Sequence, residues 1–473
     1  DDGPAKLAKA RLALQRNRGG LQLLISRIPE DLKRDPGLAY DRFEWRLRHK
    51  LPDKAIELLL FQSDTPGRLG KPDKWAAARL NLARDLMWDK KSEKAYDVLK
   101  NHQLKEGRDY AELEWLAGFI ALRKLNNPQA ALVHFKNHEV AVGSAISLGR
   151  THYWQGRALQ AIGQLDASTR AYKKGARYQT SFYGLLASEA AGVPLNPRLI
   201  GSGMHLGWRQ SGFANSSVLE AGLLFFKVGQ PRRGVRFLTH LAESQNSNDM
   251  AKLAGMAEEL RIPYLQLMLG KRAAQYNVML ERHFYPLHPI LVNKKDIAPE
   301  LGLAIARRES EFFAGAISRV GALGLMQVMP KTAKEMAGKL GVRYSRNKML
   351  KDPYYNAGIG IRYLQELQEE FGNSPVQVAA AYNAGPSRAR NWTEQLGDPR
   401  LGQIDVIDWI EQIPFGETRN YVMRVAESLP NYRARLAGQT SPLNFLTELK
   451  GNYRPPPPFA APAVSLRPVG RSK

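Results

Sequence analysis

A pattern of paired helices, repeated at an interval of about 38 residues, runs through roughly the first 280 residues of the chain. Residues 115–132, which begin Trp-Leu-Ala-Gly, are similar to residues 153–172, which begin Tyr-Trp-Gln-Gly. Residues 45–59, 83–99 and 221–238 share the same order of large and small side chains around a turn. Each such pair buries its apolar face only against the next pair, so the array is an α-solenoid that curves into an arc or a ring. We therefore predict an all-α fold.

The chain is strongly basic, with 69 Lys and Arg against 45 Asp and Glu and a formal net charge of +24. Residues 1–300 hold 46 of the basic and 30 of the acidic residues, so the excess belongs mainly to the helical array. A surface of this kind attracts polyanions. Because the chain contains no zinc finger, RNP motif or base-reading basic helix, we do not expect nucleic acid as the partner.

Several other chemistries are excluded by what the chain lacks. It has no cysteine, which removes disulfides, thiolate metal sites and cysteine nucleophiles. All nine histidines precede residue 290, and no nucleotide-binding glycine loop is present. His134 and His138, next to Glu139, have a spacing that suits a metal, but without a third ligand we interpret them as surface residues of a helix. We expect no metal and no cofactor.

Glu309 is the candidate catalytic residue. Leu301, Ile305, Arg308 and Phe312 follow the spacing of one helix face, which predicts an amphipathic helix through Phe312 with Glu309 at the edge of its buried side. Ile305, Phe312 and Phe313 can then lie against the carboxyl group. Apolar neighbours raise the pKa of a carboxyl group toward the range of a general acid. The alternative interpretation is an ordinary solvated glutamate.

Four further segments of the C-terminal third contain turns and helix ends, which are typical places for side chains that form a site. Residues 318–330 contain Gly321 and Gly324, where the backbone bends. Asp352-Pro353 and Ser374-Pro375 are the capping pairs that begin helices. The second of these helices ends at Gly385-Pro386 and leaves Tyr382 and Asn383 near its end. The sequence of residues 409–422 predicts a helix end, a Pro-Phe turn and the start of a new helix.

These segments resemble the catalytic domain of the soluble lytic transglycosylases, goose-type-lysozyme-like enzymes that cut bacterial peptidoglycan. The motifs that carry the resemblance are Glu309-Ser310, Gly321 to Gln327, Ala381 to Gly385 and Ile413 to Arg419. The resemblance implies a lysozyme-like catalytic domain, an N-terminal α-superhelix related to tetratricopeptide repeats, and Glu309 as acid and base. It further implies a substrate cleft lined by Ser318, Gln327, Met329, Tyr382, Asn383 and Glu411.

The resemblance also implies a reaction that uses one glutamate twice. Glu309 would protonate the oxygen between N-acetylmuramic acid and N-acetylglucosamine and then deprotonate the muramyl C6 hydroxyl, which closes on C1 to give a 1,6-anhydro end. Glycosidases normally use two carboxylates. A hydrolase with Glu411 as the second carboxylate is therefore an alternative, although Glu411 and Glu417 can instead pair with Arg419 or Arg424. Glu311 is excluded as a partner because it points away around the helix. A non-catalytic binding scaffold is the second alternative.

We predict four parts: an α-superhelical domain over residues 1–215, a helical linker domain over 216–288, the lysozyme-like catalytic domain over 289–436 and a proline-rich tail over 437–473. We expect a monomeric periplasmic enzyme that binds peptidoglycan glycan strands, with other cell-wall enzymes as further partners. The sequence has no apolar run long enough for a membrane span, and its polar start shows no signal peptide, as in a processed secretory protein or a cytosolic one. Whether cleavage is exolytic or endolytic stays open.

Overall fold

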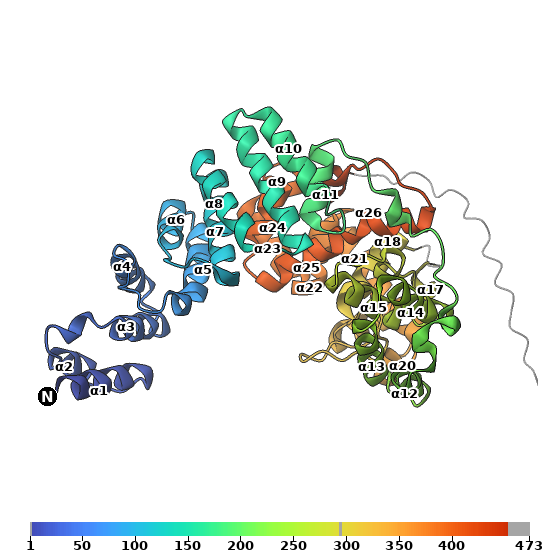
Figure 1. The fold of residues 1–473 in the computed structure, drawn as a ribbon, viewed down its shortest axis with the longest axis horizontal. Helices are drawn as coiled ribbons and strands as arrows, with labels where there is room; N and C mark the ends of the chain where they lie inside the picture. The colour runs from blue at the N-terminus through green and yellow to red at the C-terminus, as the bar shows by residue number, and fades with distance from the viewer. Residues whose placement is uncertain (1, 293–295, 453–473) are drawn as a thin grey trace, which may run out of the picture. The chain divides into compact units, whose positions relative to one another are not determined.

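A computed structural model describes residues 2–292 and 296–452 of the chain. The chain divides into two compact units, Asp1–Tyr178 and Gln179–Lys473 (Figure 1). Within the described residues, regular structure is helical, apart from isolated antiparallel bridges between residues 317 and 328. The helices of the first unit are α1 (Gly3–Gln15), α2 (Leu21–Ser26), α3 (Pro36–Arg48), α4 (Pro52–Ser63), α5 (Pro72–Trp88), α6 (Ser92–Lys100), α7 (Gly107–Arg123), α8 (Pro128–Ala141), α9 (Ala145–Ile162) and α10 (Leu165–Gly175).

The predicted repeat is visible in the packing of two successive helix pairs. Gly118 of α7 lies against the ring of Phe135 in α8, and a Cβ atom at Gly118 would be 2.6 Å from that ring. Gly156 of α9 lies in the same way against the ring of Tyr172 in α10, at 2.4 Å from a Cβ atom. In each pair a glycine lets two helices approach closely over an aromatic ring. Each pair also packs on the next, because α7 and α8 both contact α9.

Several buried polar side chains of this array are hydrogen-bonded to one another. Glu114 of α7 is buried and bonds to His102 at 3.1 Å, His134 at 2.6 Å and Asn137 at 3.2 Å. His138 is also buried and bonds to the Thr151 hydroxyl at 2.5 Å. The interpretation of His134 and His138 as surface residues is therefore wrong, because they face the array and complete its internal hydrogen bonds. Across the described residues, no group of three His, Asp or Glu side chains is arranged to hold a metal ion.

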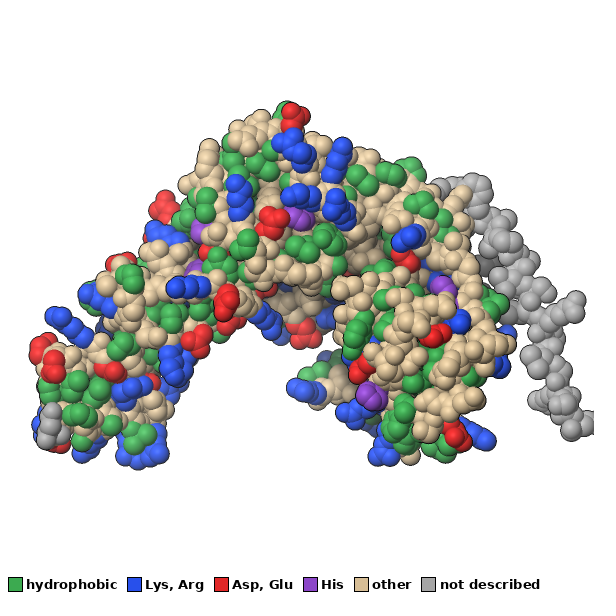
Figure 2. All heavy atoms as spheres, viewed as in Figure 1, with side chains coloured by type: hydrophobic (Ala, Val, Ile, Leu, Met, Phe, Trp, Pro, Cys, Tyr) green, Lys and Arg blue, Asp and Glu red, His purple; other side chains and the backbone are tan. Residues whose placement is uncertain are grey.

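Basic side chains gather over the α9–α10 hairpin on the face that Figure 2 displays. The exposed basic residues of α10 and the turn after it are Arg170, Lys173, Lys174 and Arg177. They are spaced along one side of the helix, so their charges add. The basicity predicted for the array thus reaches its surface at this hairpin.

The second unit is also built from helices. They are α11 (Phe182–Ala190), α12 (Ser217–Lys227), α13 (Pro231–Glu243), α14 (Ser247–Glu259), α15 (Pro263–Gln275), α16 (Glu281–Phe284), α17 (Pro289–Val292), α18 (Pro299–Glu309), α19 (Pro330–Lys339), α20 (Arg346–Lys351), α21 (Pro353–Phe371), α22 (Pro375–Ala384), α23 (Pro386–Leu396), α24 (Val406–Gln412), α25 (Gly416–Ala426), α26 (Ser428–Ala437) and α27 (Phe445–Leu449). Short 3₁₀ segments, including η2 (Pro197–Ile200), join some of them.

Helix α18 lies inside this unit, in contact with α17, α25 and α26, while α22 packs on α21 and α25. The predicted caps set the ends of these helices. Asp352 accepts hydrogen bonds from the amides of Tyr354 and Tyr355 at the start of α21, both at 3.0 Å. Ser374 accepts one from the amide of Gln377 at the start of α22. Apolar residues of α12 to α15 form a separate core.

Part of the predicted tail is folded. Phe445 and Leu449 of α27 are buried, and the Leu449 carbonyl accepts a hydrogen bond from the Ser374 hydroxyl at 2.8 Å. The proline-rich stretch from residue 453 onward lies outside the described residues. The four-part division stays a prediction. Within the part of the chain that the structure describes, no helix has the length and apolar character needed to cross a lipid bilayer.

Candidate active site

Helix α18 brings Glu309 into the interior at its last residue. Residues 301–307 of the helix are all buried, so it is enclosed by its neighbours on every side rather than amphipathic. The predicted continuation through Phe312 is wrong. The chain leaves the helix after Glu309, and Glu311 and Phe312 have φ angles of 56° and 70°. Three tertiary contacts of residues 310–313 stabilise this turn more than a further turn of helix would.

The first of these contacts is a hydrogen bond from the Ser310 hydroxyl to the Leu325 carbonyl, at 2.5 Å. The second is an ion pair between Glu311 and Lys271 of α15. The third is the packing of the two aromatic rings, Phe312 against His288 and Phe313 against Tyr264, with ring centres 5.5 and 5.1 Å apart. Glu311 is therefore directed to α15, which agrees with its exclusion as a partner of Glu309, although the reason is the turn and not the helix.

Glu309 is half-buried, and its Oε1 accepts a hydrogen bond from the Tyr421 hydroxyl at 2.7 Å. Burial raises the pKa of Glu309 to about 7, because removal of water penalises the charged carboxylate. The Tyr421 bond and the charge of Arg308 act in the opposite direction, and the negative charge of Glu417 adds to the rise. A carboxyl group with this pKa is present in both protonation states near neutral pH, as an acid that is later a base requires.

Tyr421 is the residue that sequence reasoning missed. It is buried on α25, and burial followed by the nearby charge of Glu309 raises its pKa well above the usual value. Its hydroxyl is therefore a hydrogen-bond donor to Glu309 at all ordinary pH values. The sequence places it in the predicted helix after the Pro-Phe turn, but no spacing rule links it to a residue 112 positions earlier.

The loop between α18 and α19 forms one side of the site, and it is held by Asn356. The side chain of Asn356 is fully buried and donates to the carbonyls of Leu323 and Met349, both at 3.0 Å, and accepts from the amide of Met326 at 2.9 Å. Gly324 has a φ of 75°, and a Cβ atom there would be 2.2 Å from the Asn356 amide nitrogen. Only glycine fits this close approach.

The three predicted site residues of this loop have different roles in its structure. The Ser318 hydroxyl accepts from the Ala322 amide at 2.9 Å and closes a turn. The side-chain amide of Gln327 donates to the carbonyls of Ala316 and Gly324, at 3.0 and 2.8 Å. Met329 is 42% exposed at the start of α19. Ser318 and Gln327 thus shape the loop, and Met329 offers an apolar surface to solvent.

Tyr382 and Asn383, at the end of α22, connect the loop with α25. The Tyr382 hydroxyl donates to the Met326 carbonyl at 2.7 Å, and Asn383 accepts from the Thr418 hydroxyl at 2.7 Å. Burial and then the charge of Glu309 raise the pKa of Tyr382, so its hydroxyl stays protonated. The structure therefore brings the ends of α18 and α22, the loop and α25 together around Glu309.

Glu411 has a different environment from the other predicted site residues. Its side chain is 0% exposed. One carboxylate oxygen accepts from the Tyr183 hydroxyl at 2.5 Å and the other lies 3.8 Å from Arg419 Nε. The ion pair with Arg419, which the sequence left as an alternative, is thus present. Tyr183 comes from α11, so a helix far away in the sequence helps to fix α24.

Residues 291–400 match the family model described as the transglycosylase SLT domain. The chain contains an SLT domain. The soluble lytic murein transglycosylase of Salmonella typhimurium is 30% identical over 311 residues, which cover 64% of this chain and 46% of that protein. The protein of the same name from Escherichia coli is 31% identical over 291 residues, with coverages of 59% and 43%. The chain thus spans less than half the length of these relatives.

Solved structures show the same fold. The lytic transglycosylase Slt from Pseudomonas aeruginosa, an inactive mutant with glutamine in place of a glutamate, matches 93% of this chain and 74% of that chain, with a TM-score of 0.66 and 24% identity. The 70 kDa soluble lytic transglycosylase from Escherichia coli matches 92% of this chain and 74% of that chain, with a TM-score of 0.62 and 21% identity. The all-α fold predicted from the sequence is confirmed.

The SLT match contains most of the predicted site. Glu309 and the predicted residues from Ser318 to Asn383 lie inside residues 291–400. Glu411 and Tyr421 follow the matched range, on α24 and α25. The Glu309 carboxyl group, inside the matched range, thus accepts its hydrogen bond from Tyr421 of α25, which lies outside that range.

Proposed function

We propose that this chain is a peptidoglycan lytic transglycosylase with Glu309 as its single acid and base. The observation that carries the proposal is the environment of the Glu309 carboxyl group, half-buried, bonded to Tyr421 and with a pKa raised by burial to about 7. The protonated group can donate at neutral pH, and the carboxylate left behind can accept a proton.

In the proposed reaction the Glu309 carboxyl group first donates a proton and later accepts one. Protonated Glu309 gives its proton to the oxygen that joins C1 of N-acetylmuramic acid to N-acetylglucosamine, and the C1–O bond breaks. The Glu309 carboxylate then removes the proton of the muramyl C6 hydroxyl, whose oxygen bonds to C1. The products are a free N-acetylglucosamine hydroxyl and a 1,6-anhydro end, without consumption of water.

The positive charge that develops at C1 needs a negative or dipolar neighbour. The hydrogen of the Tyr382 hydroxyl is bonded to the Met326 carbonyl, so the oxygen lone pairs of Tyr382 are the part that can face such a charge. The N-acetyl oxygen of the substrate is the other candidate. Both alternatives supply the support that a second carboxylate gives in most glycosidases.

The surroundings of the other acidic groups favour one glutamate over two. Glu411 is fully buried and engaged by Tyr183 and Arg419, and Glu311 is paired with Lys271. A hydrolase would need one of them, or the exposed Glu417, to hold a water molecule at C1. The replacement of a glutamate by glutamine in the inactive Pseudomonas aeruginosa protein is consistent with one essential glutamate.

The remaining predictions belong to this proposal. Ser318, Gln327, Met329, Tyr382 and Asn383 are the proposed substrate-binding residues, whereas the fully buried Glu411 holds α24 in place through Tyr183 and Arg419. The basic array of residues 1–215 attracts the anionic peptidoglycan strand. The relatives come from Gram-negative bacteria and are named for action on murein, which supports a periplasmic enzyme.

The proposal is tested by mass spectrometry of the muropeptides that the protein releases from purified peptidoglycan. Products with 1,6-anhydro ends, lighter by one water than hydrolysis products, are the expected result. Reducing ends would identify a hydrolase and require a second carboxylate. Binding to peptidoglycan without release of any product would identify a scaffold.

A further inference from the structure

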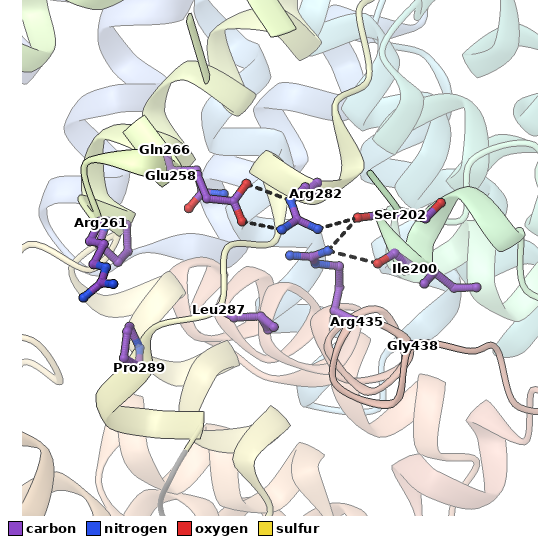
Figure 3. Close-up of a pocket in the computed structure, with 12 residues that line it drawn as sticks. Ile200, Ser202, Glu258, Arg261, Gln266, Arg282, Leu287, Pro289, Arg435 and Gly438 are labelled. Atoms are coloured by element: carbon purple, nitrogen blue, oxygen red, sulfur yellow. Dashed lines mark hydrogen bonds and ion pairs between the residues drawn. The ribbon is translucent and has the colours of Figure 1, made fainter. Parts of the chain in front are cut away.

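A cavity of about 320 Å³ lies in the second unit, among residues that take no part in the Glu309 site (Figure 3). Its charged lining residues are Glu258 at the end of α14, Arg261 in the next turn, Arg282 of α16 and Arg435 of α26. Apolar side chains complete the wall, among them Ile200, Pro263, Leu287 and Pro289. Volumes of this size are typical of small-molecule sites, and mixed apolar and polar walls are typical of them as well.

The two central arginines are held close together by one carbonyl group. Gly201 accepts hydrogen bonds from Arg282 Nη1 at 2.9 Å and from Arg435 Nη1 at 3.0 Å. The φ angle of Gly201 is 63°, and a Cβ atom there would be 2.5 Å from Arg435 Nη1 and 2.9 Å from Arg282 Cα. Glycine is therefore needed for this approach. The backbone is built to bring two like charges together, which costs free energy unless an anion is near.

Among the described residues that line the cavity, one carboxylate, that of Glu258, accompanies three guanidinium groups. Glu258 is used by Arg282 through two hydrogen bonds of 2.7 Å. Within the part of the chain that the structure describes, the acceptors of Arg435 are the carbonyl groups of Tyr285, Ile200 and Gly201. Among the described residues, Arg261 has no side-chain hydrogen bond or ion pair. Arg261 and Arg435 therefore have no hydrogen bond or ion pair to a carboxylate within the described residues, although the charge of Glu258 also acts on Arg435.

Burial and, to a smaller extent, nearby positive charges lower the pKa values of two basic groups in this region. Burial, followed by the charge of Arg282, lowers the pKa of Arg435 to about 10. Burial, followed by the charges of His205, Arg282 and Arg435, lowers the pKa of His283 to about 3. His283 is fully buried beside the cavity, where its ring bonds to Gln266, a lining residue. The field in this region thus favours a bound anion.

We propose that this cavity binds the free carboxylate of a short peptide. Figure 3 shows Arg261 on one side, Arg282 and Arg435 on the other, and Leu287 between them. The carboxylate would accept a hydrogen bond from the Nη2 group of Arg435, which has no acceptor among the described residues, and a backbone carbonyl group at the other end of the peptide would accept one from Arg261 across the cavity. The aliphatic side chains of the peptide would cover Leu287 and the two prolines. A small inorganic anion would leave this apolar wall exposed to water, so it fits the cavity less well.

The site is independent of Glu309, so it can be tested apart from the proposed function. If the chain cuts peptidoglycan, the peptides of that polymer are one source of the carboxylate and free peptides are another. Binding of N-acetyl-Ala-Ala to the full chain is measured by titration calorimetry, with its C-terminal amide and inorganic phosphate as comparison ligands. Purified peptide-bearing muropeptides, added as competitors, distinguish the two sources.

Arg261→Gln is the test variant, because Arg261 is exposed and its loss leaves the fold intact. Arg236→Gln, at another exposed arginine, on α13, that does not line the cavity, is the matched control. We expect the dipeptide acid to bind, and the amide and Arg261→Gln each to weaken binding about tenfold, the effect of one charge-assisted hydrogen bond. Arg236→Gln should change nothing. Equal affinity for acid and amide, no effect of Arg261→Gln, tighter binding of phosphate, or no binding at millimolar ligand would each overturn the proposal.

Discussion

Two glutamates, the buried Glu114 of the first unit and the half-buried Glu309 of the second, show how the same side chain is used for structure in one place and prepared for chemistry in another. Burial pushes the pKa of Glu114 upward, but its bonds to His102, His134 and Asn137 outweigh burial and lower the pKa to about 2. Glu309 receives one bond, from Tyr421, and burial prevails with a pKa of about 7. The number of hydrogen-bond partners, and not burial alone, decides which glutamate can carry a proton at neutral pH.

The largest effect is expected at Glu309. Glu309→Gln keeps the volume but cannot release a proton, so muropeptide release should fall about a thousandfold or more. Glu369→Gln, at an exposed position of α21, should have no effect and is the control. Activity of Glu309→Gln within tenfold of the wild type would remove Glu309 from the mechanism.

The same variant should change stability with a sign that depends on pH. The folded-state pKa of Glu309 is raised from 4.5 to about 7, so the wild type loses stability as the pH rises through this range. Above pH 7, Glu309→Gln should therefore be more stable than the wild type, by up to about 3 kcal/mol. Urea unfolding at acid and at alkaline pH measures the difference, and a stability gain that does not vary with pH would contradict the assigned pKa.

Glu114→Gln should have the opposite effect on stability. Removal of the charge from a buried group with three partners should lower the free energy of unfolding by about 3 kcal/mol at neutral pH. Because the pKa of Glu114 is lowered from 4.5 to about 2, this cost should be complete above pH 4.5 and vanish as the pH falls toward 2. Glu93→Gln, on the exposed side of α6, is the control for urea unfolding. An unchanged unfolding midpoint in Glu114→Gln would show that the network is not stabilising.

Substitution of one glycine in each unit should change the stability of the protein in opposite directions, by smaller amounts. Gly118→Ala adds a Cβ atom 2.6 Å from the Phe135 ring and should destabilise the array by about 2 kcal/mol. Gly358→Ala lies in α21 with no atom within 4 Å of its Cβ, so it should stabilise the protein by up to about 1 kcal/mol through helix propensity. Thermal unfolding of both variants measures the two signs. Stabilisation by Gly118→Ala would mean that the helices of the repeat do not pack as closely as described.

The smallest effects are shifts of the pH profile of cleavage. Tyr421→Phe removes a bond that lowers the pKa of Glu309, so the alkaline limb of the profile should move up by about half a pH unit. Glu417→Gln removes a charge that raises this pKa, so the limb should move down. Tyr354→Phe, at a residue that is 68% exposed, is the control. Shifts in the same direction for both variants would contradict the account of the carboxyl environment.

Several helix starts of the second unit can be predicted because the residues that set them are close together in the sequence. Asp352-Pro353 and Ser374-Pro375 begin helices where the sequence predicts, since a cap depends only on the next few residues. The repeat around Gly118 and Gly156 was also predictable, because a solenoid repeats contacts that are close in sequence.

The errors came from contacts between distant residues. The helix pattern through Phe312 is broken by Lys271, His288 and Leu325, which no helix rule includes. The prediction of surface positions for His134 and His138 is wrong because their partners, Glu114 and Thr151, belong to other helices. The bond between Tyr421 and Glu309, and that between Tyr183 and Glu411, were missed for the same reason.

The most direct test of the contrast between the two glutamates is a carbon-13 NMR titration of their carboxyl groups, assigned by comparison with Glu309→Gln and Glu114→Gln. The account predicts that Glu309 titrates near pH 7 and that Glu114 stays ionised down to about pH 2. Titration of both groups at the ordinary glutamate value, near 4.5, would contradict it.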